Sequence, residues 1–370
     1  SDPTSPTSVG QLEDGSGCAT DDIDKTCLAH VSTVAATTID GGEYVVAAGH
    51  TDDGIEIVDV SSPDSPVQTS SFSDTTPNSG GCTTGTVCLD RPNDVAIATI
   101  GGNTYAVVAA ANDDGIAIID ISTPGSPTHV ISIVDDAAKE LDQAYSVAIA
   151  TISGSTYVVA VGYADDGIAI IDISTPASPV YVSELEDDTD TGKCSAANGE
   201  RCLDGPTSVA VETIGGLTYA IVVSKDDSAV TVIDITTPSN PTIVAMVYDD
   251  NDKELLGAKA VSIATIGDSI YAVVSGSTDD GIEIIHLYTG STITITSSSG
   301  SSGDTVTSDT LSYTVSLGST ANDFTIEDIT VTGTANSGSP EASNFAGSGT
   351  TYTFDVIRGS SDGTVSVSVA

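Results

Sequence analysis

Short apolar runs recur along most of the chain, and polar turn residues separate them in a fixed order. In one copy a Gly-Gly turn joins the runs DVAIATI (residues 94–100) and YAVVA (residues 105–109). The acidic turn DDG (residues 113–115) then leads into IAIIDI (residues 116–121). Apolar, β-branched runs of this length between turn residues are typical of β-strands. The pattern therefore predicts antiparallel strands in an all-β protein.

Five copies of this pattern fill residues 32–287, and a Ser-Thr-Pro-x-Ser-Pro type of turn leads to a fourth short strand in most of them. A repeat of four strands with a period above 40 residues is the pattern of a β-propeller blade. We therefore predict a five-bladed propeller. The tyrosine that opens the second strand marks each copy: Tyr44, Tyr105, Tyr157, Tyr219 and Tyr271.

The start of the chain matches the turn that precedes a fourth strand. Residues 1–6 (SDPTSP) resemble residues 122–127 (STPGSP), whereas the fifth copy lacks that turn and its fourth strand. We therefore expect residues 7–12 to supply the outer strand of the last blade, which removes an exposed sheet edge. The same strand supplied by a neighbouring molecule would instead give an open head-to-tail chain.

The repeat unit resembles a known family. Its YVVA run, its DDGI-x-IIDIS run and its paired prolines resemble the LVIVD-type propeller repeat of bacterial and archaeal surface proteins. The resemblance covers about residues 1–288. It implies a propeller and a surface location, and it carries no catalytic motif.

Residues 289–370 have a different character, because charged residues become rare and Ser, Thr and Gly dominate. Alternating runs such as LSYTVS (residues 311–316) and TVSVSV (residues 364–369) predict several short strands and a β-sandwich. The segments at residues 324–331 and 344–352 resemble bacterial Ig-like domains. We therefore expect a propeller domain over residues 1–288 and an Ig-like sandwich over residues 289–370.

Charge excludes several functional classes. Lys and Arg total 9 and Asp and Glu total 53, for a net charge of −44. Such a chain repels phosphate backbones and anionic headgroups, so we expect no nucleic-acid partner and no membrane insertion. The apolar fraction of 39% argues against a disordered acidic chain. The single methionine is Met246, so we expect a processed N-terminus.

Six cysteines fall in three close pairs, and the loops that hold them are insertions on the shared repeat. Pairing of neighbours within each loop is the simplest connectivity. The alternative is a zinc site, for which only Cys27 with His30 comes close to ligand spacing. Disulfides imply an oxidising, extracellular or cell-surface location. The predicted pairs are Cys18–Cys27, Cys82–Cys88 and Cys194–Cys202.

The acidic turns are the main candidate for a binding site. In a four-stranded blade the turn after the second strand and the connection to the next blade emerge on one face, which would carry a dense ring of carboxylates. Carboxylates are hard oxygen ligands that suit Ca²⁺, so calcium is the predicted cofactor, mostly where neighbouring blades meet. The alternative is that Asp-Asp-Gly simply favours tight turns. The candidate ligands in the turns are Asp52, Asp53, Asp113, Asp114, Asp165, Asp166, Asp226, Asp227, Asp279 and Asp280. The connections add Glu13, Asp14, Asp135, Asp136, Glu186, Asp187, Asp188, Asp249, Asp250 and Asp252.

Other polar residues support structural roles. The aspartates that end the third strands precede a Pro turn and are expected to cap backbone N–H groups. His30 and His50 are candidates for a transition-metal site or for solvated loop residues. No nucleophile elbow, HExxH or phosphate loop is present, so we predict no catalytic residue. The capping aspartates are Asp59, Asp120, Asp172 and Asp234.

Together these features favour a secreted, non-enzymatic structural or adhesive subunit of a cell surface or extracellular fibre. We expect it to assemble with copies of itself through strand edges and domain ends. One alternative is a monomeric, calcium-dependent module that binds protein or glycan ligands. A second alternative is a propeller glycoside hydrolase, in which paired carboxylates at the channel mouth would act.

Overall fold

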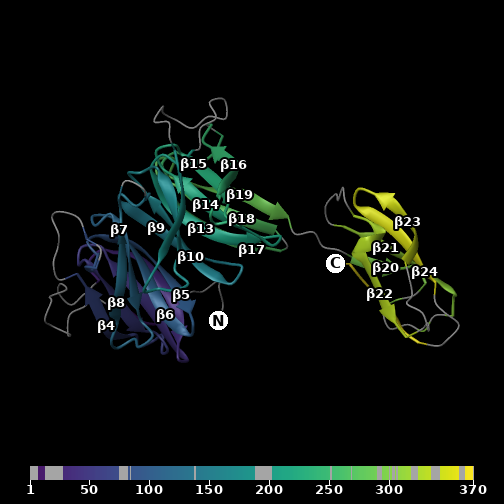
Figure 1. Cartoon of the computed structure of the whole chain (residues 1–370), viewed down its shortest axis with the longest axis horizontal. Helices are drawn as coiled ribbons and strands as arrows, with labels where there is room; N and C mark the ends of the chain where they lie inside the picture. Colours follow the sequence, from purple (N-terminus) through teal and green to yellow (C-terminus); the bar gives the residue numbers. More distant parts are fainter. Residues whose placement is uncertain are drawn as a thin grey trace. The chain divides into compact units, whose positions relative to one another are not determined.

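The structure is a computed structural model of an all-β protein, whose described residues form β-strands and one short 3₁₀ helix, η1 (Ile326–Asp328) (Figure 1). It divides into two compact units, Ser1–Ile263 with Ala272–Ile285, and Ala264–Tyr271 with His286–Ala370. Among the described residues, no helix has the length and hydropathy needed to cross a membrane. The described residues are 7–12, 28–74, 82–83, 85–136, 139–187, 202–250, 252–267, 269–289, 294–299, 301, 305, 307–317, 324–334, 342–357 and 363–369.

The repeats form four antiparallel sheets in which four strands pair in chain order. The first sheet comprises β1 (Val31–Ile39), β2 (Gly42–Gly49), β3 (Gly54–Asp59) and β4 (Val67–Ser73). The second comprises β5 (Pro92–Ile100), β6 (Asn103–Ala110), β7 (Gly115–Asp120) and β8 (Thr128–Val134). The third comprises β9 (Ala144–Ile152), β10 (Ser155–Gly162), β11 (Gly167–Asp172) and β12 (Val180–Glu186). The fourth comprises β13 (Pro206–Ile214), β14 (Leu217–Ser224), β15 (Ala229–Asp234) and β16 (Thr242–Tyr248).

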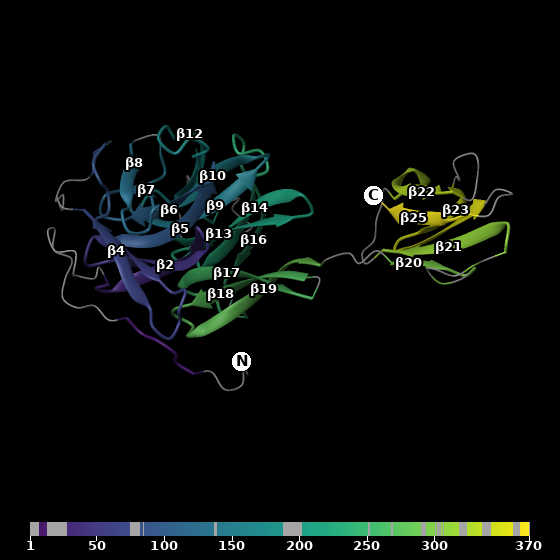
Figure 2. The same cartoon turned by 90° about the horizontal axis from the view of Figure 1, so that it is seen from below.

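A fifth sheet has three strands, β17 (Ala258–Ile266), β18 (Ser269–Gly276) and β19 (Gly281–Thr289). The small, repeated antiparallel sheets are consistent with a β-propeller (Figure 2). The prediction that residues 7–12 pair with this sheet as its outer strand is wrong in this structure, because that segment forms no strand. The outer edge of β19 therefore has no strand partner among the described residues.

Within residues 7–12, Gly10 instead lies against the turn between β3 and β4 of the first sheet. A Cβ added to Gly10 would lie 2.3 Å from the Pro63 carbonyl oxygen, so only glycine permits this close approach. An equivalent contact occurs at the next boundary, where Ser70 on β4 donates from Oγ to the Pro124 carbonyl oxygen of the second sheet. Gly10 and Ser70 each follow a proline by four positions. The segment thus contacts the first sheet as an outer strand would, but it does not pair with β19.

Apolar side chains between neighbouring sheets form the core of the first unit. Ile116 and Ile118 on β7 are fully buried among side chains of the third sheet. Ala117 and Ile119, on the opposite face of the same strand, are buried among side chains of the first sheet. Burying one such isoleucine contributes roughly 1.5–3 kcal/mol. The third and fourth sheets share a similar core that includes Ile170.

Polar groups on the first strands link successive sheets. Asp94 on β5 accepts hydrogen bonds from Ser146 Oγ at 2.7 Å and from the Val147 N–H at 3.0 Å, both on β9. Ser146 Oγ in turn accepts from the Val209 N–H of β13 at 3.3 Å. These bonds bind the first strands of three sheets to one another, at positions where the sheets leave backbone groups unpaired.

The third-strand aspartates cap the turns that follow them, as predicted. Asp120 Oδ1 accepts from the Ser122 N–H at 2.9 Å, and Asp172 Oδ1 accepts from the Ser174 N–H at 2.8 Å. Asp59 and Asp234 make the same bond in the first and fourth sheets. Their role in the described structure is therefore the local satisfaction of backbone groups.

The second unit contains two further sheets, whose side chains share one apolar core. Tyr352, Phe354 and Val356 of one sheet pack with Ile329 and Val367 of the other. Alternation of apolar and polar residues along each strand produces this arrangement, because one face of each sheet must be buried. The four-stranded sheet comprises β20 (Thr294–Ser297), β21 (Thr310–Ser316), β24 (Thr351–Ile357) and β23 (Ala342–Ser348). The two-stranded sheet comprises β22 (Ile329–Gly333) and β25 (Val365–Val369).

Two repeat-equivalent isoleucines test whether the fifth sheet lacks a neighbour on one face. Ile118 is fully buried, whereas Ile284, at the same repeat position, is 56% exposed. We expect Ile118→Ala to lower the free energy of unfolding by about 2–5 kcal/mol, because it leaves a cavity. Ile284→Ala should change it by less than about 0.5 kcal/mol. Urea unfolding followed by circular dichroism measures both, and an equal loss would mean that the face of β19 is covered in solution.

Candidate functional site

The acidic turns bind the loops at one end of the sheets. In every repeat, one turn aspartate accepts a hydrogen bond from a backbone N–H in the loop that precedes the first strand of the same sheet. The donor lies 23 residues before the aspartate in each case. The acceptors are Asp52, Asp113, Asp165, Asp227 and Asp279, and the N–H donors are Ala29, Asp90, Asp142, Asp204 and Leu256, at 2.7–2.9 Å. The predicted Asp226–Asp227 pair is therefore out of register by one residue, since Asp227 aligns with the first aspartate of the other turns. This correction follows from the turn DDSA, in which Ser228 takes the place of the second aspartate.

The second residue of each turn reaches the next sheet. Asp53 Oδ1 accepts from the Arg91 N–H at 3.1 Å, and Asp114 Oδ1 accepts from the Gln143 N–H at 3.0 Å. Asp166 Oδ1 accepts from the Gly205 N–H at 2.8 Å. These aspartates have left-handed backbones, with φ of 50° to 57°, a conformation that aspartate tolerates better than most residues. The acidic turns therefore fasten neighbouring sheets together.

Four aspartates lie at each of three boundaries between sheets, and we call these groups the junction clusters. Among the described residues, no three aspartates of one cluster place carboxylate oxygens within 4.8 Å of one another. Each comprises the second turn aspartate of one sheet, the residue after its fourth strand, the loop residue before the next first strand and the next first turn aspartate. The clusters are Asp53, Asp74, Asp90 and Asp113; Asp114, Asp135, Asp142 and Asp165; and Asp166, Asp187, Asp204 and Asp227. At the fourth boundary Ser228 and Leu256 replace two of the carboxylates.

Sequence reasoning missed one member of each cluster, the loop aspartates Asp90, Asp142 and Asp204, and it also missed Asp74. A signal was present, because each loop aspartate precedes its turn aspartate by 23 residues. The predicted residues Glu13, Asp14 and Asp188 lie outside the described residues. Two others pair with lysines, Asp136 with Lys139 and Asp250 with Lys253.

Burial and mutual repulsion raise the pKa of carboxyls in the clusters. Burial, followed by the charges of Asp74, Asp90 and Asp53, raises the pKa of Asp113 to about 6. Burial, followed by Asp166 and Asp227, raises the pKa of Asp204 to about 7. Burial also raises the pKa of Asp135 to about 6. Each cluster therefore holds negative charge at neutral pH at a cost that a bound cation would offset.

Glu140 lies beside the second of these clusters and is 8% exposed. Burial raises its pKa to about 8, and the charges of Asp165, Glu186, Glu184 and Asp135 add to the effect. This environment favours the protonated form of Glu140. Carboxyl groups whose environments separate their pKa values in this way are typical of acid–base pairs.

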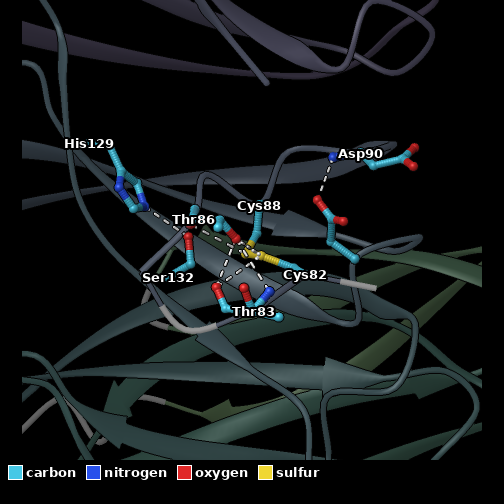
Figure 3. The surroundings of a disulfide bond; sticks show 8 residues. Cys82, Thr83, Thr86, Cys88, Asp90, His129 and Ser132 are labelled. Atoms are coloured by element: carbon cyan, nitrogen blue, oxygen red, sulfur yellow. Dashed lines mark hydrogen bonds between the residues drawn. A yellow bond between two sulfur atoms is a disulfide. The ribbon is translucent and has the colours of Figure 1, made fainter. Parts of the chain in front are cut away.

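The first cluster lies against a disulfide (Figure 3). The predicted bond between Cys82 and Cys88 is present, and both sulfurs lie within 4.8 Å of an Asp113 carboxylate oxygen. Oxidised sulfurs are not thiolate ligands, so the cysteines offer no zinc site here. Asp113 is fully buried, and its Oδ1 has no hydrogen-bond partner among the described residues.

The other predicted disulfides are only partly described. Cys202 is disulfide-bonded, and its predicted partner Cys194 lies outside the described residues. Cys18 and Cys27 also lie outside them, so their pairing and the zinc alternative with His30 stay predictions.

The two histidines of the first sheet use their ring nitrogens locally. Arg91 Nε donates to His50 Nε2 at 2.7 Å, and His30 Nδ1 lies 2.6 Å from Thr51 Oγ1. Burial, followed by the Arg91 charge, lowers the pKa of His50. The His50 lone pair that would bind a metal ion is thus engaged by Arg91.

Comparison with known proteins identifies the repeat. The LVIVD repeat matches residues 42–74, 96–135, 153–187 and 216–249, which confirms the resemblance for four of the five predicted copies. No curated protein matches the chain. The structure is similar to a protein from Lactobacillus plantarum, with 13% identity, a TM-score of 0.47, and coverage of 80% of this chain and 82% of the other.

Two similar structures are glycoside hydrolases. One is a thermostable family-43 glycoside hydrolase, with 14% identity, a TM-score of 0.41, and coverage of 70% of this chain and 91% of the other. The other is an exo-β-1,3-galactanase from Phanerochaete chrysosporium, with 9% identity, a TM-score of 0.42, and coverage of 98% and 93%.

These structures contradict the prediction of a non-enzymatic structural or adhesive subunit, because the two with a stated activity are enzymes. Repeat pattern and composition alone led to that prediction, and a fold pattern does not determine what its loops do. The same likenesses, all below a TM-score of 0.5, supply neither a substrate nor a reaction for this chain.

The raised pKa values predict how stability depends on pH in the metal-free protein. Folded Asp113, Asp204 and Glu140, with pKa values of about 6, 7 and 8, bind protons that the unfolded chain has released above about pH 4–4.5. The free energy of unfolding should therefore fall as pH rises from 5 to 8. Urea midpoints at pH 5.5 and 8.0, measured with chelator, check this. Glu140→Gln should flatten the decline above pH 7, and a midpoint that rises with pH would contradict the assignment.

Proposed function

We propose that this chain is an extracytoplasmic, calcium-binding β-propeller whose junction clusters hold Ca²⁺ between neighbouring sheets. The observation that carries the proposal is the repetition of the same four-aspartate arrangement at three boundaries. In the first cluster the buried Asp113 contributes an oxygen with no hydrogen-bond partner among the described residues. A buried carboxylate oxygen without a partner costs free energy that a cation would recover.

The chemistry of the clusters favours calcium over softer metals. All four side chains at each cluster are carboxylates, and Ca²⁺ binds six to eight oxygen ligands in flexible geometry. Zinc and copper prefer imidazole or thiolate ligands, and the nearby His50 and Cys82 are engaged by Arg91 and by a disulfide. Backbone hydrogen bonds to Asp113 and Asp53 hold one oxygen of each carboxylate in place before an ion binds.

A cation in this position would join two sheets. The members of a cluster come from two successive sheets, so an ion bound among them adds an ionic link to the apolar contact below. It would also reduce the repulsion of a chain with a net charge of −44. Extracellular calcium modules bind with dissociation constants of roughly 0.1–1 mM. The disulfide between Cys82 and Cys88 supports the same oxidising location.

We also propose the finer architecture. The three-stranded sheet would be the fifth blade, and the contact of Gly10 with Pro63 supports this count because it matches the contact of Ser70 with Pro124 at the next boundary. The shared core of the two C-terminal sheets supports an Ig-like domain over residues 289–370.

The calcium proposal predicts a stability that depends on the ion. Addition of Ca²⁺ to chelator-treated protein should raise the melting temperature. Each site should add about 2.7 kcal/mol to the free energy of unfolding when free Ca²⁺ is 100 times the dissociation constant. Asp113→Asn keeps an acceptor for the Asp90 N–H but removes a ligand charge, so it should reduce the calcium-dependent shift. Differential scanning calorimetry and isothermal titration measure the shift and the number of sites.

The matched control is Asp64→Asn, which changes an exposed aspartate in the turn before β4. It should retain the full calcium response. A melting temperature that is unchanged by millimolar Ca²⁺, or an equal loss of response in both variants, would contradict the proposal.

A second candidate function rests on Glu140. A buried carboxyl with a raised pKa, close to the Asp165 and Asp135 carboxyl groups, resembles the pair that a glycoside hydrolase uses, with one group as acid and another as nucleophile or base. Release of reducing sugar from a panel of polysaccharides tests this reading. Activity that Glu140→Gln abolishes, without a change in the circular dichroism spectrum, would support it. Activity that this variant retains would exclude Glu140 as the acid.

A further inference from the structure

The repeats differ from one another where the loops meet the first strands. Two positions per sheet lie here, joined by a backbone hydrogen bond from the residue after the second strand to the residue that precedes the first strand. The later residues of the first strands are similar among repeats, but these positions carry five different pairs. The pairs are His30 with His50, Arg91 with Ala111, Gln143 with Tyr163, Gly205 with Lys225, and Gly257 with Ser277.

Backbone strain marks the first member of each pair. All five have a left-handed backbone, and in the fourth and fifth sheets this residue is glycine. His30, Arg91 and Gln143 adopt φ values of 52°, 58° and 51° at the equivalent place. A non-glycine residue in this conformation is sterically disfavoured, because its Cβ lies close to the following carbonyl oxygen. Three repeats therefore place a polar side chain where glycine would be less strained, which is a pattern of functional positions.

Beside these pairs in the third and fourth sheets lies a group of four side chains, Tyr145, Tyr163, Lys225 and Asp226, which we call the aromatic platform. The rings of Tyr145 and Tyr163 lie 5.8 Å apart at 37°. Tyr163 donates from its hydroxyl to Asp226 Oδ2 at 2.8 Å. Lys225 lies with Nζ 5.5 Å from the centre of the Tyr163 ring and 3.4 Å from its hydroxyl oxygen. The platform therefore combines two phenol rings, a cation and a carboxylate.

The ammonium group of Lys225 has no carboxylate at ion-pair distance among the described residues. Lys139 and Lys253 each pair with an aspartate, whereas Lys225 and Lys259 are exposed and form no such pair. Tyr163 holds it instead, through its ring and its hydroxyl. The positive charge is thus fixed in position and remains available to an anionic group of a ligand.

We propose that Tyr145, Tyr163, Lys225 and Asp226 form a binding site for a hexuronate, a sugar ring that carries a carboxylate. A tyrosine ring offers an apolar face to the C–H groups of a pyranose and a polar rim beside it. Lys225 would bind the sugar carboxylate, and Asp226 would accept from a sugar hydroxyl. Gln143 is exposed, and its backbone carbonyl oxygen accepts a hydrogen bond from the Tyr163 N–H. Its side-chain amide offers a further donor and acceptor.

The overall negative charge does not prevent this binding. At physiological ionic strength the Debye length is about 8 Å, so carboxylates farther away act weakly on a ligand bound at Lys225. A ligand therefore responds mainly to the groups that it contacts. The uronate should therefore bind more weakly at low salt than at moderate salt, because salt screens its repulsion by distant carboxylates of the protein.

Isothermal titration with trigalacturonate and with a neutral galactose trimer tests the site, using the full chain in chelator so that calcium cannot bridge protein and sugar. We expect the uronate trimer to bind more tightly. Lys225→Met should weaken it by about tenfold and leave the neutral trimer unchanged, since it removes the cation that would donate a charge-assisted hydrogen bond to the sugar carboxylate. Tyr145→Ala should weaken both ligands.

Two further variants separate binding from folding. Lys139→Met removes a lysine that is paired with Asp136, and it should bind both trimers as the parent does. Tyr163→Phe keeps the ring but loses the hydroxyl that holds Lys225, so it should reduce the preference for the uronate. No binding of either trimer, equal binding of both, or an unaltered Lys225→Met variant would overturn the proposal. Because calcium is absent throughout, an ion held by the junction clusters cannot bridge protein and sugar. An unchanged circular dichroism spectrum in chelator shows that a loss of binding does not come from unfolding.

Discussion

Contact between the apolar faces of neighbouring sheets is the constraint on which the rest of the first unit depends. Each sheet is too small to bury its own residues, so isoleucines such as Ile116 and Ile118 are buried only because another sheet covers them. Alternation along the strand then gives each sheet a second apolar face, on which Ala117 and Ile119 meet the preceding sheet. A repeat with two apolar faces must continue from sheet to sheet. The fifth sheet shows what happens without a neighbour, because Ile282 is 62% exposed on β19.

The acidic turns follow from the same geometry. Sheets that pack face to face bring their loops together at one end, and there the backbone leaves N–H groups that need acceptors. Asp113 and Asp114 satisfy one donor within the sheet and one in the next. Using carboxylates for this purpose concentrates negative charge at every boundary, and this raises the pKa of the most buried members. The feature that fastens the sheets therefore also creates the arrangement that we assign to calcium.

A repeat array separates structure from recognition in a simple way. Positions that every copy must share, such as the turn aspartates and the apolar strand residues, maintain the array. Positions that the copies need not share are free to diverge, and they do so beside the first strands, where Gln143 and Tyr163 stand opposite Gly205 and Lys225 of the next sheet. The retained strain at Gln143 indicates that the side chain there is more than a turn residue.

The sequence by itself determined the strands, the repeat and the capping aspartates, because these depend on local periodicity and on hydrogen bonds within a few residues. It also determined the disulfide between Cys82 and Cys88, whose partners are six residues apart. Only the tertiary structure decided which carboxylates meet. Asp90 and Asp113 are separated by 23 residues, Asp53 and Arg91 by 38, and the register of the fourth turn shifted by one. Tertiary structure also decided that Gly10 lies against the first sheet and that residues 7–12 do not pair with β19. Such contacts depend on how the sheets pack, and no local pattern of residues records that packing.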